Sequence, residues 1–285
     1  MTQEAISQEA KTTTAKQKIC FIGAGNMTRS IASGLVASGY PKTLIHATNP
    51  SEAKLIALQQ DLGIQVSHDN LAAAKEADIV VLSVKPQLMQ QVCEALSVLD
   101  LADKLIITIA AGVTAKRYHD FFNQPIKLIR TMPNTPTQIG YGMTGLYAES
   151  SVSDSDKALC EQIMQTGGEV LWVAKEDDLN QVIALAGSSP AYFFLMMEAM
   201  IDSAKQDGVD EATARALVQQ AALGAAHMVK ENQQLSAGQL RENVTSKGGT
   251  TAQALATFED AGLRTIVRQA MHNCMARAQE MAKQF

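Results

Sequence analysis

The chain of 285 residues is 46% hydrophobic and 19% charged, which is typical of a soluble globular protein with one large or two medium domains. Its net charge of −5 provides no basic field for nucleic acid, so we expect no nucleic-acid partner and small anionic ligands held by local donors. The four cysteines lack a CxxC motif and the five histidines lack metal-ligand spacing, which predicts free thiols, a reducing compartment and no metal site.

The beginning of the chain is polar and contains no apolar segment of the kind found in signal peptides. Residues 1–17 are therefore predicted to be a disordered tail. No apolar run approaches the roughly 20 residues of a membrane-spanning helix. We expect a cytoplasmic protein with no membrane partner.

From Lys18 onward, short apolar runs alternate with helical patterns. The predicted strands are 18–23, 43–48, 78–84, 104–112 and 127–134, with 142–150 and 168–174 as candidates for two more. Helical stretches such as 26–39, 51–63 and 87–99 lie between strands. Apolar strands that take turns with helices indicate βαβ units and a parallel sheet covered on both faces. The fold class is therefore α/β, with a doubly wound sheet over residues 18–176.

The last part of the chain, residues 177–285, contains no convincing strand. Its predicted helices are 178–187, 190–208, 211–232, 250–262 and 263–285. Pro190 after Ser188 and Ser189 is typical of a helix start. The helices of this predicted all-α domain are rich in alanine and methionine, which form either ordinary core or a helix–helix interface between subunits.

A glycine motif directly follows the first predicted strand. Gly23 and Gly25 lie where the strand turns tightly into a helix, so the backbone can approach a ligand and helix amides can face a pyrophosphate. The motif predicts a dinucleotide site; the alternative is a strand–helix turn without a ligand. Thr28 occupies the position of the usual third glycine or alanine and predicts a slightly wider approach of the helix. The predicted loop comprises Ile22, Gly23, Ala24, Gly25, Asn26 and Met27.

The end of the second predicted strand bears on the choice of cofactor. NAD-preferring sites place an acidic residue there. Here Thr48 and Asn49 carry no charge, and the first carboxylate is Glu52. Ser51 and Lys54 could instead contact a 2′-phosphate, which favours NADP. The alternative is that these residues only form a turn and a helix cap.

Three further strand ends, within 83–87, 109–113 and 130–136, are small, rich in glycine or proline, and polar at few positions. Ligands of open parallel sheets bind beyond such ends. Lys85 is either a binding residue or a solvated surface charge. Asn134, between two prolines, is either a helix cap or a contact to the nicotinamide ribose.

The stretch VTSKGGTT at 244–251 places hydroxyl residues around a pair of glycines at a predicted helix start. Backbone amides of Gly248 and Gly249, together with the dipole of the following helix, could bind a small carboxylate. The alternative is a hydroxyl-rich helix cap. The pattern alone leaves both open.

Six motifs in this order, FIGAGNM, SVKPQ, AAGVT, MPNTP, GSSPAY and TSKGGTT, resemble the pyrroline-5-carboxylate reductase family from about Lys18 to the C-terminus. The resemblance implies an N-terminal Rossmann domain followed by a helical domain that dimerises. It further implies reduction of L-1-pyrroline-5-carboxylate to L-proline with NADPH or NADH, the last step of proline biosynthesis. Self-association and a small-molecule substrate are the partners that it implies.

The resemblance also implies site residues. The cofactor would be held by the glycine loop and by Ser83, Val84, Lys85, Pro86, Asn70, Ala110 and Ala111. The substrate would be held by Lys85, Val244, Thr245, Ser246, Gly248, Gly249 and Thr250, with the Thr251 hydroxyl directing the imine nitrogen as the catalytic residue. Two positions depart from the family pattern: Thr28 replaces a glycine, and Lys247 replaces a proline that would make the loop more rigid.

Two other functions are compatible with parts of the pattern. Hydroxyacid dehydrogenases share a dinucleotide domain followed by helices, but they use a lysine on the helix that opens the second domain. Here that helix has only Lys205, at its far end. A dinucleotide-sensing regulator would not need the loop at 244–251.

Overall fold

The computed structural model describes residues 16–284, which form two compact units. The first contains the described residues up to Val182 together with the end of the last helix from Gln279, and the second contains Ile183–Ala278. The predicted tail, residues 1–17, lies almost wholly outside the described residues.

The first unit contains the sheet. Its strands are β1 Ile19–Ile22, β2 Ile45–Thr48, β3 Gln65–Ser67, β4 Ile79–Leu82, β5 Leu105–Thr108, β6 Lys127–Met132, β7 Gly142–Ala148 and β8 Gly168–Trp172. Its helices are α1 Asn26–Ala37, α2 Glu52–Leu62, α3 Asn70–Glu76, α4 Met89–Leu96, α5 Ala115–Phe122, α6 Asp154–Gln165 and α7 Leu179–Val182. Short 3₁₀ turns are η1 Lys42–Leu44, η2 Pro86–Leu88, η3 Thr135–Ile139 and η4 Glu176–Asp178.

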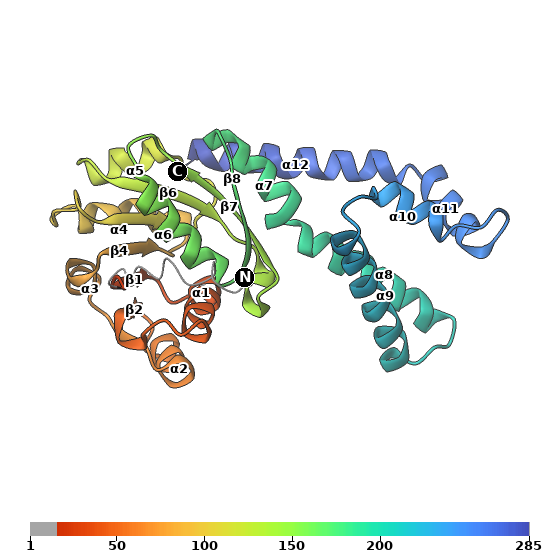
Figure 1. The fold of residues 1–285 in the computed structure, drawn as a ribbon, viewed down its shortest axis with the longest axis horizontal. Helices are drawn as coiled ribbons and strands as arrows, with labels where there is room; N and C mark the ends of the chain where they lie inside the picture. The colour runs from red at the N-terminus through yellow and green to blue at the C-terminus, as the bar shows by residue number, and fades with distance from the viewer. Residues whose placement is uncertain (1–15, 285) are drawn as a thin grey trace, which may run out of the picture. The chain divides into compact units, whose positions relative to one another are not determined.

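Within the described residues, the strands form one eight-stranded sheet in the order β3-β2-β1-β4-β5-β6-β7-β8. Neighbours from β3 to β6 are parallel, β6 and β7 are antiparallel, and β7 and β8 are parallel to each other. The strand order runs outward in both directions from β1 and β4, which is the doubly wound arrangement that the sequence predicts (Figure 1). The predicted α/β fold class is confirmed.

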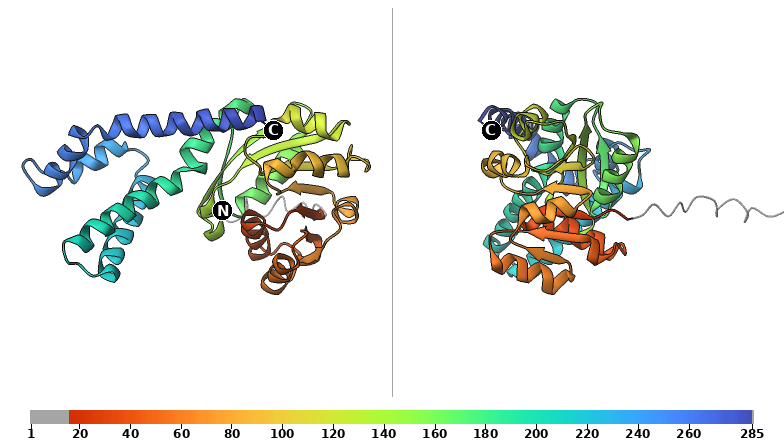
Figure 2. Two further views of the ribbon diagram at one scale, coloured as in Figure 1. Left: turned by 180° about the vertical axis from the view of Figure 1, so that it is seen from behind. Right: turned by 90° about the vertical axis from the view of Figure 1, so that its left-hand side faces the viewer.

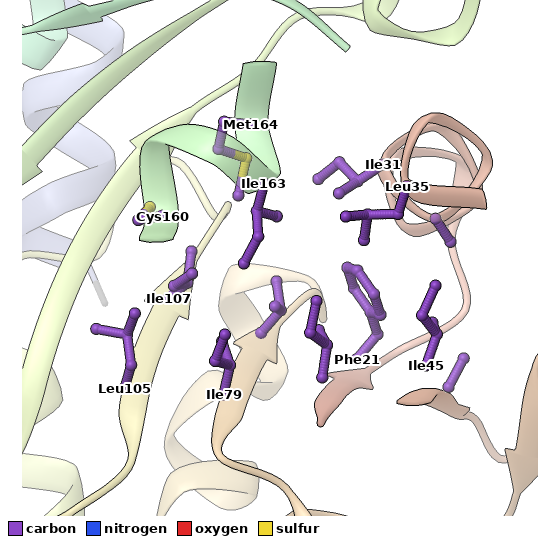
Figure 3. Close-up of a cluster of buried hydrophobic side chains, with 14 of the residues drawn as sticks. Phe21, Ile31, Leu35, Ile45, Ile79, Leu105, Ile107, Cys160, Ile163 and Met164 are labelled. Carbon is purple, nitrogen blue, oxygen red and sulfur yellow. The ribbon is translucent and has the colours of Figure 1, made fainter. Parts of the chain in front are cut away.

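Both faces of the sheet are covered by helices, because β1 and β4 at its centre are apolar and buried at every position. On one face, Phe21 and Ile79 point toward Ile31 and Leu35 of α1 and toward Ile163 of α6 (Figure 3). On the other face, Ile22 and Leu82 belong to a second buried cluster with α3, α4 and α5. These layers position the strand ends rigidly at one edge of the sheet.

The second unit is entirely helical over its described residues. It begins with the π-helical turn η5 Ile183–Gly187 and continues with α8 Ser189–Gln206, α9 Glu211–Glu231, α10 Ala237–Asn243, α11 Thr250–Asp260 and α12 Leu263–Gln284, of which the end belongs to the first unit. Helices α8 and α9 pack side by side (Figure 2). Their outer faces expose large apolar side chains, including Phe193, Phe194, Leu195 and Leu217. This unit therefore buries little apolar surface on its own.

The residues from Gln279 onward, at the end of α12, belong with the sheet and not with the other helices. Met281 packs directly against Gly112, in the loop after β5. A Cβ atom added to Gly112 would lie 2.8 Å from Cβ of Met281, which is too close for any side chain. The last turns of the chain therefore support a loop of the first unit.

Two elements were not predicted. Strand β3 has only three residues, at the edge of the sheet. Helix α10 has seven residues, and Ser236 and Gln239 form a reciprocal capping box at its start.

The expectation that no apolar run approaches membrane-spanning length was wrong for one stretch. Among the described residues, Glu176–Gln206 is long and apolar enough to cross a membrane by length and composition alone, with a mean hydropathy of 1.4 over an 18-residue window. The sequence predicted a division at Ser188 and Pro190. In the structure α7 runs directly into η5, and only the bend residue Ser188 separates η5 from α8.

Candidate active site

The loops that the sequence singles out in the first unit lie at one edge of the sheet. Strands β1, β2, β4, β5 and β6 run parallel, and their registers align Ile22 with Thr48 and Leu82 with Thr108. Because parallel strands end at the same edge, the glycine loop and the segments after Thr48, Leu82, Thr108 and Met132 share that edge.

The glycine loop is clamped between the ends of β2 and β4. The amide of Gly23 donates to the carbonyl of Thr48 at 2.9 Å, and the amide of Ser83 donates to the carbonyl of Ile22 at 2.9 Å. Gly23 has φ +114°, and a Cβ atom there would lie 2.6 Å from the carbonyl oxygen of Ser83. Only glycine fits this position.

Gly25 differs from Gly23, because a Cβ atom there would enter open space. It is the N-cap of α1, and no side chain caps that helix. The first amides of an α-helix have no partner within the helix and carry the positive end of its dipole. Open space in front of uncapped amides fits the pyrophosphate of a dinucleotide.

Thr28 is fully buried behind the loop, and its hydroxyl donates to the carbonyl of Gly23 at 2.7 Å. The buried hydroxyl of Thr28 thus has a hydrogen-bond partner, and this bond links α1 to the glycine loop.

Thr48 and Asn70, two predicted ribose-side residues, lie together. The Thr48 hydroxyl donates to Oδ1 of Asn70 at 2.6 Å, which leaves the Asn70 amide group to donate elsewhere. Ser51 is the N-cap of α2, but its side chain forms no capping bond. Lys54 is exposed in the first turn of α2. Ser51 therefore occupies the helix-cap position that the sequence offered as an alternative, but its side chain does not form the capping hydrogen bond.

Lys85 is exposed after β4, at the N-cap of η2 with Pro86 next to it. Asn134 is buried, and its Oδ1 accepts a hydrogen bond from the amide of Met143 at 2.9 Å. This bond ties the loop after β6 to β7. The geometry of Asn134 therefore supports a structural role.

Ala110 and Ala111 follow β5, and a buried polar network lies beneath them. Tyr118 on α5 bonds to Thr108 at the end of β5, with 2.5 Å between the two hydroxyl oxygens. Burial raises the pKa of Tyr118, so this hydroxyl stays protonated. Glu176 accepts a hydrogen bond from the amide of Ala115 at 2.6 Å. Two contacts, one to β5 and one to Glu176, thereby hold the first part of α5.

Arg130 on β6 donates to the same Glu176 oxygen and forms an ion pair with it. The Arg130 side chain is only 8% exposed. Its Nε has no partner among the described residues, so Glu176 is its main source of charge compensation. The sequence reading missed Arg130, Glu176 and Tyr118. The one signal was a charged residue inside the apolar run KLIRTM.

The segment 244–251 belongs to the second unit. Gly249 is the N-cap of α11, Gly248 has φ +73°, and the helix has no side-chain cap. Thr245 donates to the carbonyl of Arg241 at 2.6 Å, and the amide of Gly249 donates to the carbonyl of Ser246 at 3.0 Å. Thr250 and Thr251 are exposed in the first turn. The hydroxyl-rich cap that was the alternative for this segment is not formed.

The cysteine thiols are free. Burial raises the pKa of Cys20 and Cys93 to about 12, so both remain protonated and unreactive near neutral pH. Among residues 16–284, no group of three or more His, Cys, Asp or Glu side chains is placed to hold a metal ion.

A doubly wound sheet with a glycine loop at its switch point, followed by helices, defines an NAD(P)-dependent oxidoreductase. Residues 18–112 match a family model described as NADP oxidoreductase, coenzyme F420-dependent, and residues 176–281 match the pyrroline-5-carboxylate reductase dimerisation model. The chain is 55% identical to the pyrroline-5-carboxylate reductase of Vibrio alginolyticus, over 94% of this chain and 99% of that protein.

Solved structures agree. The pyrroline-5-carboxylate reductase of Coxiella burnetii is 42% identical, with a TM-score of 0.87 over 93% of this chain and 98% of the other. The Plasmodium falciparum pyrroline carboxylate reductase with NADP bound is 27% identical, with a TM-score of 0.84 over 94% and 98%. The chain belongs to the pyrroline-5-carboxylate reductase family. It is an oxidoreductase that reduces L-1-pyrroline-5-carboxylate to L-proline with NADPH or NADH, in proline biosynthesis.

Proposed function

We propose that Thr251 is the catalytic residue of this reduction, and that Gly248, Gly249 and their neighbouring hydroxyls hold the substrate carboxylate. The observation that carries the proposal is that Thr250 and Thr251 occupy the first turn of α11 without capping it. Their hydroxyls are therefore available beside a bend at Gly248, where helix amides favour an anion. The exposed Lys247 adds a positive charge next to this bend.

The cofactor supplies the hydride; the protein supplies position and electrostatics. We assign the glycine loop to the pyrophosphate, Thr48 and Asn70 to the adenosine ribose, and Ala110 and Ala111 to the nicotinamide. Ser83, Val84, Lys85 and Pro86 line the same edge of the sheet. The fit rests on the open space in front of Gly25 and on the buried network that holds the start of α5.

The Thr251 hydroxyl would donate to or accept from the imine nitrogen, whose charge changes as hydride arrives. A hydrogen bond at a reacting atom can strengthen in the transition state, so its loss appears in kcat. A protonated imine is already electrophilic, so no strong general acid is needed, and orientation carries much of the rate.

Replacing Thr251 with alanine is expected to lower kcat about tenfold while NADPH binding stays nearly intact. Loss of one preorganised donor from an oxyanion site lowers kcat about 10²–10³-fold. We expect a smaller loss here because the imine is already reactive. Steady-state kinetics with L-1-pyrroline-5-carboxylate and a fluorescence titration with NADPH measure the two quantities. Thr250→Ala and Ser246→Ala serve as matched controls that should raise KM more than they lower kcat. Wild-type turnover by Thr251→Ala would leave this hydroxyl without a catalytic role.

We further propose that NADPH is preferred over NADH, because β2 ends in Thr48 and Asn49 and not in a carboxylate. Ser51 at the N-cap and Lys54 in the first turn of α2 are placed to meet a 2′-phosphate. The ratio of kcat/KM for the two cofactors tests this preference. A higher kcat/KM with NADH would contradict it and leave Lys54 as a surface charge. The same assay, with the natural imine, tests the function itself.

The helical region, residues 177–285, carries the family's dimerisation segment, and we propose that it pairs two chains in the cytoplasm, with substrate bound at the helical domain. A groove of about 600 Å³ in α11 and α12 supports this, since its lining is mainly apolar: Leu255, Phe258, Leu263, Val267, Met271 and Met275. Apolar surface of this kind marks association sites.

Sedimentation of the full chain is expected to give at least twice the 30.5 kDa of one chain. Replacing Val267 and Met271 together with lysine should shift the population toward monomers and lower activity, because two charges would enter an apolar groove. Lys230→Glu, on α9, is the control, because it changes charge at a position that does not line the groove. A compact, active monomer of the wild type would refute this assembly.

A further inference from the structure

A histidine–carboxylate pair lies at the edge of the sheet beside the end of β2. Nε2 of His68, in the turn after β3, lies 2.5 Å from Oε2 of Glu52, the first residue of α2. Nδ1 of His68 lies 2.7 Å from the carbonyl oxygen of Asn49. The backbones are also joined here, since the amide of Asn49 donates to the carbonyl of Ser67 at 3.3 Å.

Both ring nitrogens of His68 therefore face acceptors. A neutral imidazole has only one N–H, so it can donate to one of them, whereas an imidazolium donates to both. The contact geometry is thus fully satisfied only by His68 in its charged form. In that form it neutralises the carboxylate of Glu52.

Glu52 occupies a sensitive position. It is the first carboxylate after β2, next to Ser51 and two residues before Lys54. A bare carboxylate there would repel the 2′-phosphate of NADP, as acidic residues at this strand end do in NAD-preferring sites.

We propose that Glu52 and His68 together determine cofactor specificity: protonated His68 offsets the Glu52 charge and admits the 2′-phosphate, and loss of that proton restores discrimination against it. The inference rests on the proposed placement of the adenosine ribose at the end of β2. It concerns NADPH against NADH and leaves the chemistry at the imine unchanged.

The other charged groups around His68 do not provide the same switch. Asp69, next in the chain, caps α3 by accepting from the amide of Ala72 at 2.9 Å. His46 on β2 bonds to the hydroxyl of Ser67 at 2.9 Å, and burial lowers its pKa, so it stays neutral above about pH 7. Lys54, two residues after Glu52 on α2, is exposed.

The direction of the pH effect follows from the partners of His68. Hydrogen bonds to Glu52, and then to Asn49, raise its pKa above the ordinary value of about 6.5. The imidazolium therefore dominates below the raised pKa and is lost as the pH rises through it. Selectivity for NADPH should fall over the same interval.

The test is a pair of fluorescence titrations, with NADPH and with NADH, on the intact protein from about pH 7 to about pH 9. This window avoids the titration of the 2′-phosphate itself, whose pKa is about 6. NADH has the same pyrophosphate and nicotinamide as NADPH, so the ratio of the two Kd values isolates the contribution of the 2′-phosphate to binding. The variants are Glu52→Gln and His68→Gln, with Glu94→Gln, an exposed carboxylate on α4, as the matched control.

In the wild type and in Glu94→Gln, the ratio Kd(NADPH)/Kd(NADH) should rise about threefold across the window, a modest change because exposed charges interact weakly through water. In Glu52→Gln the ratio should stay low and flat. In His68→Gln it should stay flat at the high value that the wild type reaches near pH 9.

The proposal would be overturned if Kd(NADPH)/Kd(NADH) did not change with pH in the wild type. It would also be overturned if this ratio rose with pH in both variants as it does in the wild type. If NADH bound more tightly than NADPH at every pH, the proposed NADPH preference would be contradicted instead. The pH dependence of the Kd ratio would still decide the role of Glu52 and His68.

Discussion

Replacing Gly25 with alanine is expected to weaken NADPH binding about 10–100-fold, since hydrogen bonds to a charged group contribute about 1.5–3 kcal/mol. The added methyl group meets no protein atom within 4 Å, so it would project into the open space in front of α1. It would keep the pyrophosphate away from the helix amides. The backbone of Gly25, at φ −84°, is accessible to alanine, so folding should be unaffected.

Gly23→Ala is the matched comparison. Its methyl group would meet the backbone carbonyl of Ser83, and its φ of +114° is unfavourable for alanine. This variant should lose stability as well as cofactor affinity. A fluorescence titration with NADPH gives affinity. Urea unfolding followed by Trp172, the single tryptophan and a residue of β8, gives the stability of the first unit. If Gly25→Ala bound NADPH as tightly as the wild type does, the proposed pyrophosphate site in front of α1 would be refuted.

Replacing Glu176 with alanine is expected to lower the free energy of unfolding by about 3 kcal/mol, the lower end for breaking a buried ion pair. Arg130 would be left charged in a buried site, and the amide of Ala115 would lose its acceptor. The urea midpoint of the Trp172 transition measures the loss. Because α5 follows the loop that contains Ala110 and Ala111, the variant should also bind cofactor less tightly.

Two further variants separate the charge from the side chain. The double variant Arg130→Met with Glu176→Leu removes both charges, so it should be more stable than Glu176→Ala alone. Glu94→Ala, on the exposed side of α4, should change stability by less than about 0.5 kcal/mol. Equal stability of Glu176→Ala and the wild type would mean that solvent compensates Arg130 and that the pair is not structural.

The fold was predictable because the central strands are short, largely apolar runs and a helical pattern follows each of them. Residues of the cofactor edge could be found for the same reason, since parallel strands deliver their ends to one side of the sheet. Strand β3 was missed because it has three residues, with Gln65 exposed at the sheet edge. Helix α10 could have been found from the spacing of Ser236 and Gln239, which is a capping-box signature.

The pairings of the supporting residues of the site were beyond sequence reasoning. Glu176 contacts Arg130 and Ala115 across separations of 46 and 61 residues, and no local pattern encodes such a pairing. Likewise, Glu52 could be recognised as the first carboxylate after β2, but not as the partner of His68. Long-range hydrogen bonds depend on how strands and loops are brought together in space.

The support of Gly112 by Met281 has a consequence for biosynthesis. Domains generally fold as units, N-terminal first, while the chain is being made. Here the sheet can assemble once Val182 has left the ribosome, but the loop after β5 gains its packing partner only when the last turns of α12 emerge. Until α12 has emerged, a nascent chain would therefore display a folded sheet with an unsupported loop at the edge that we propose for the cofactor.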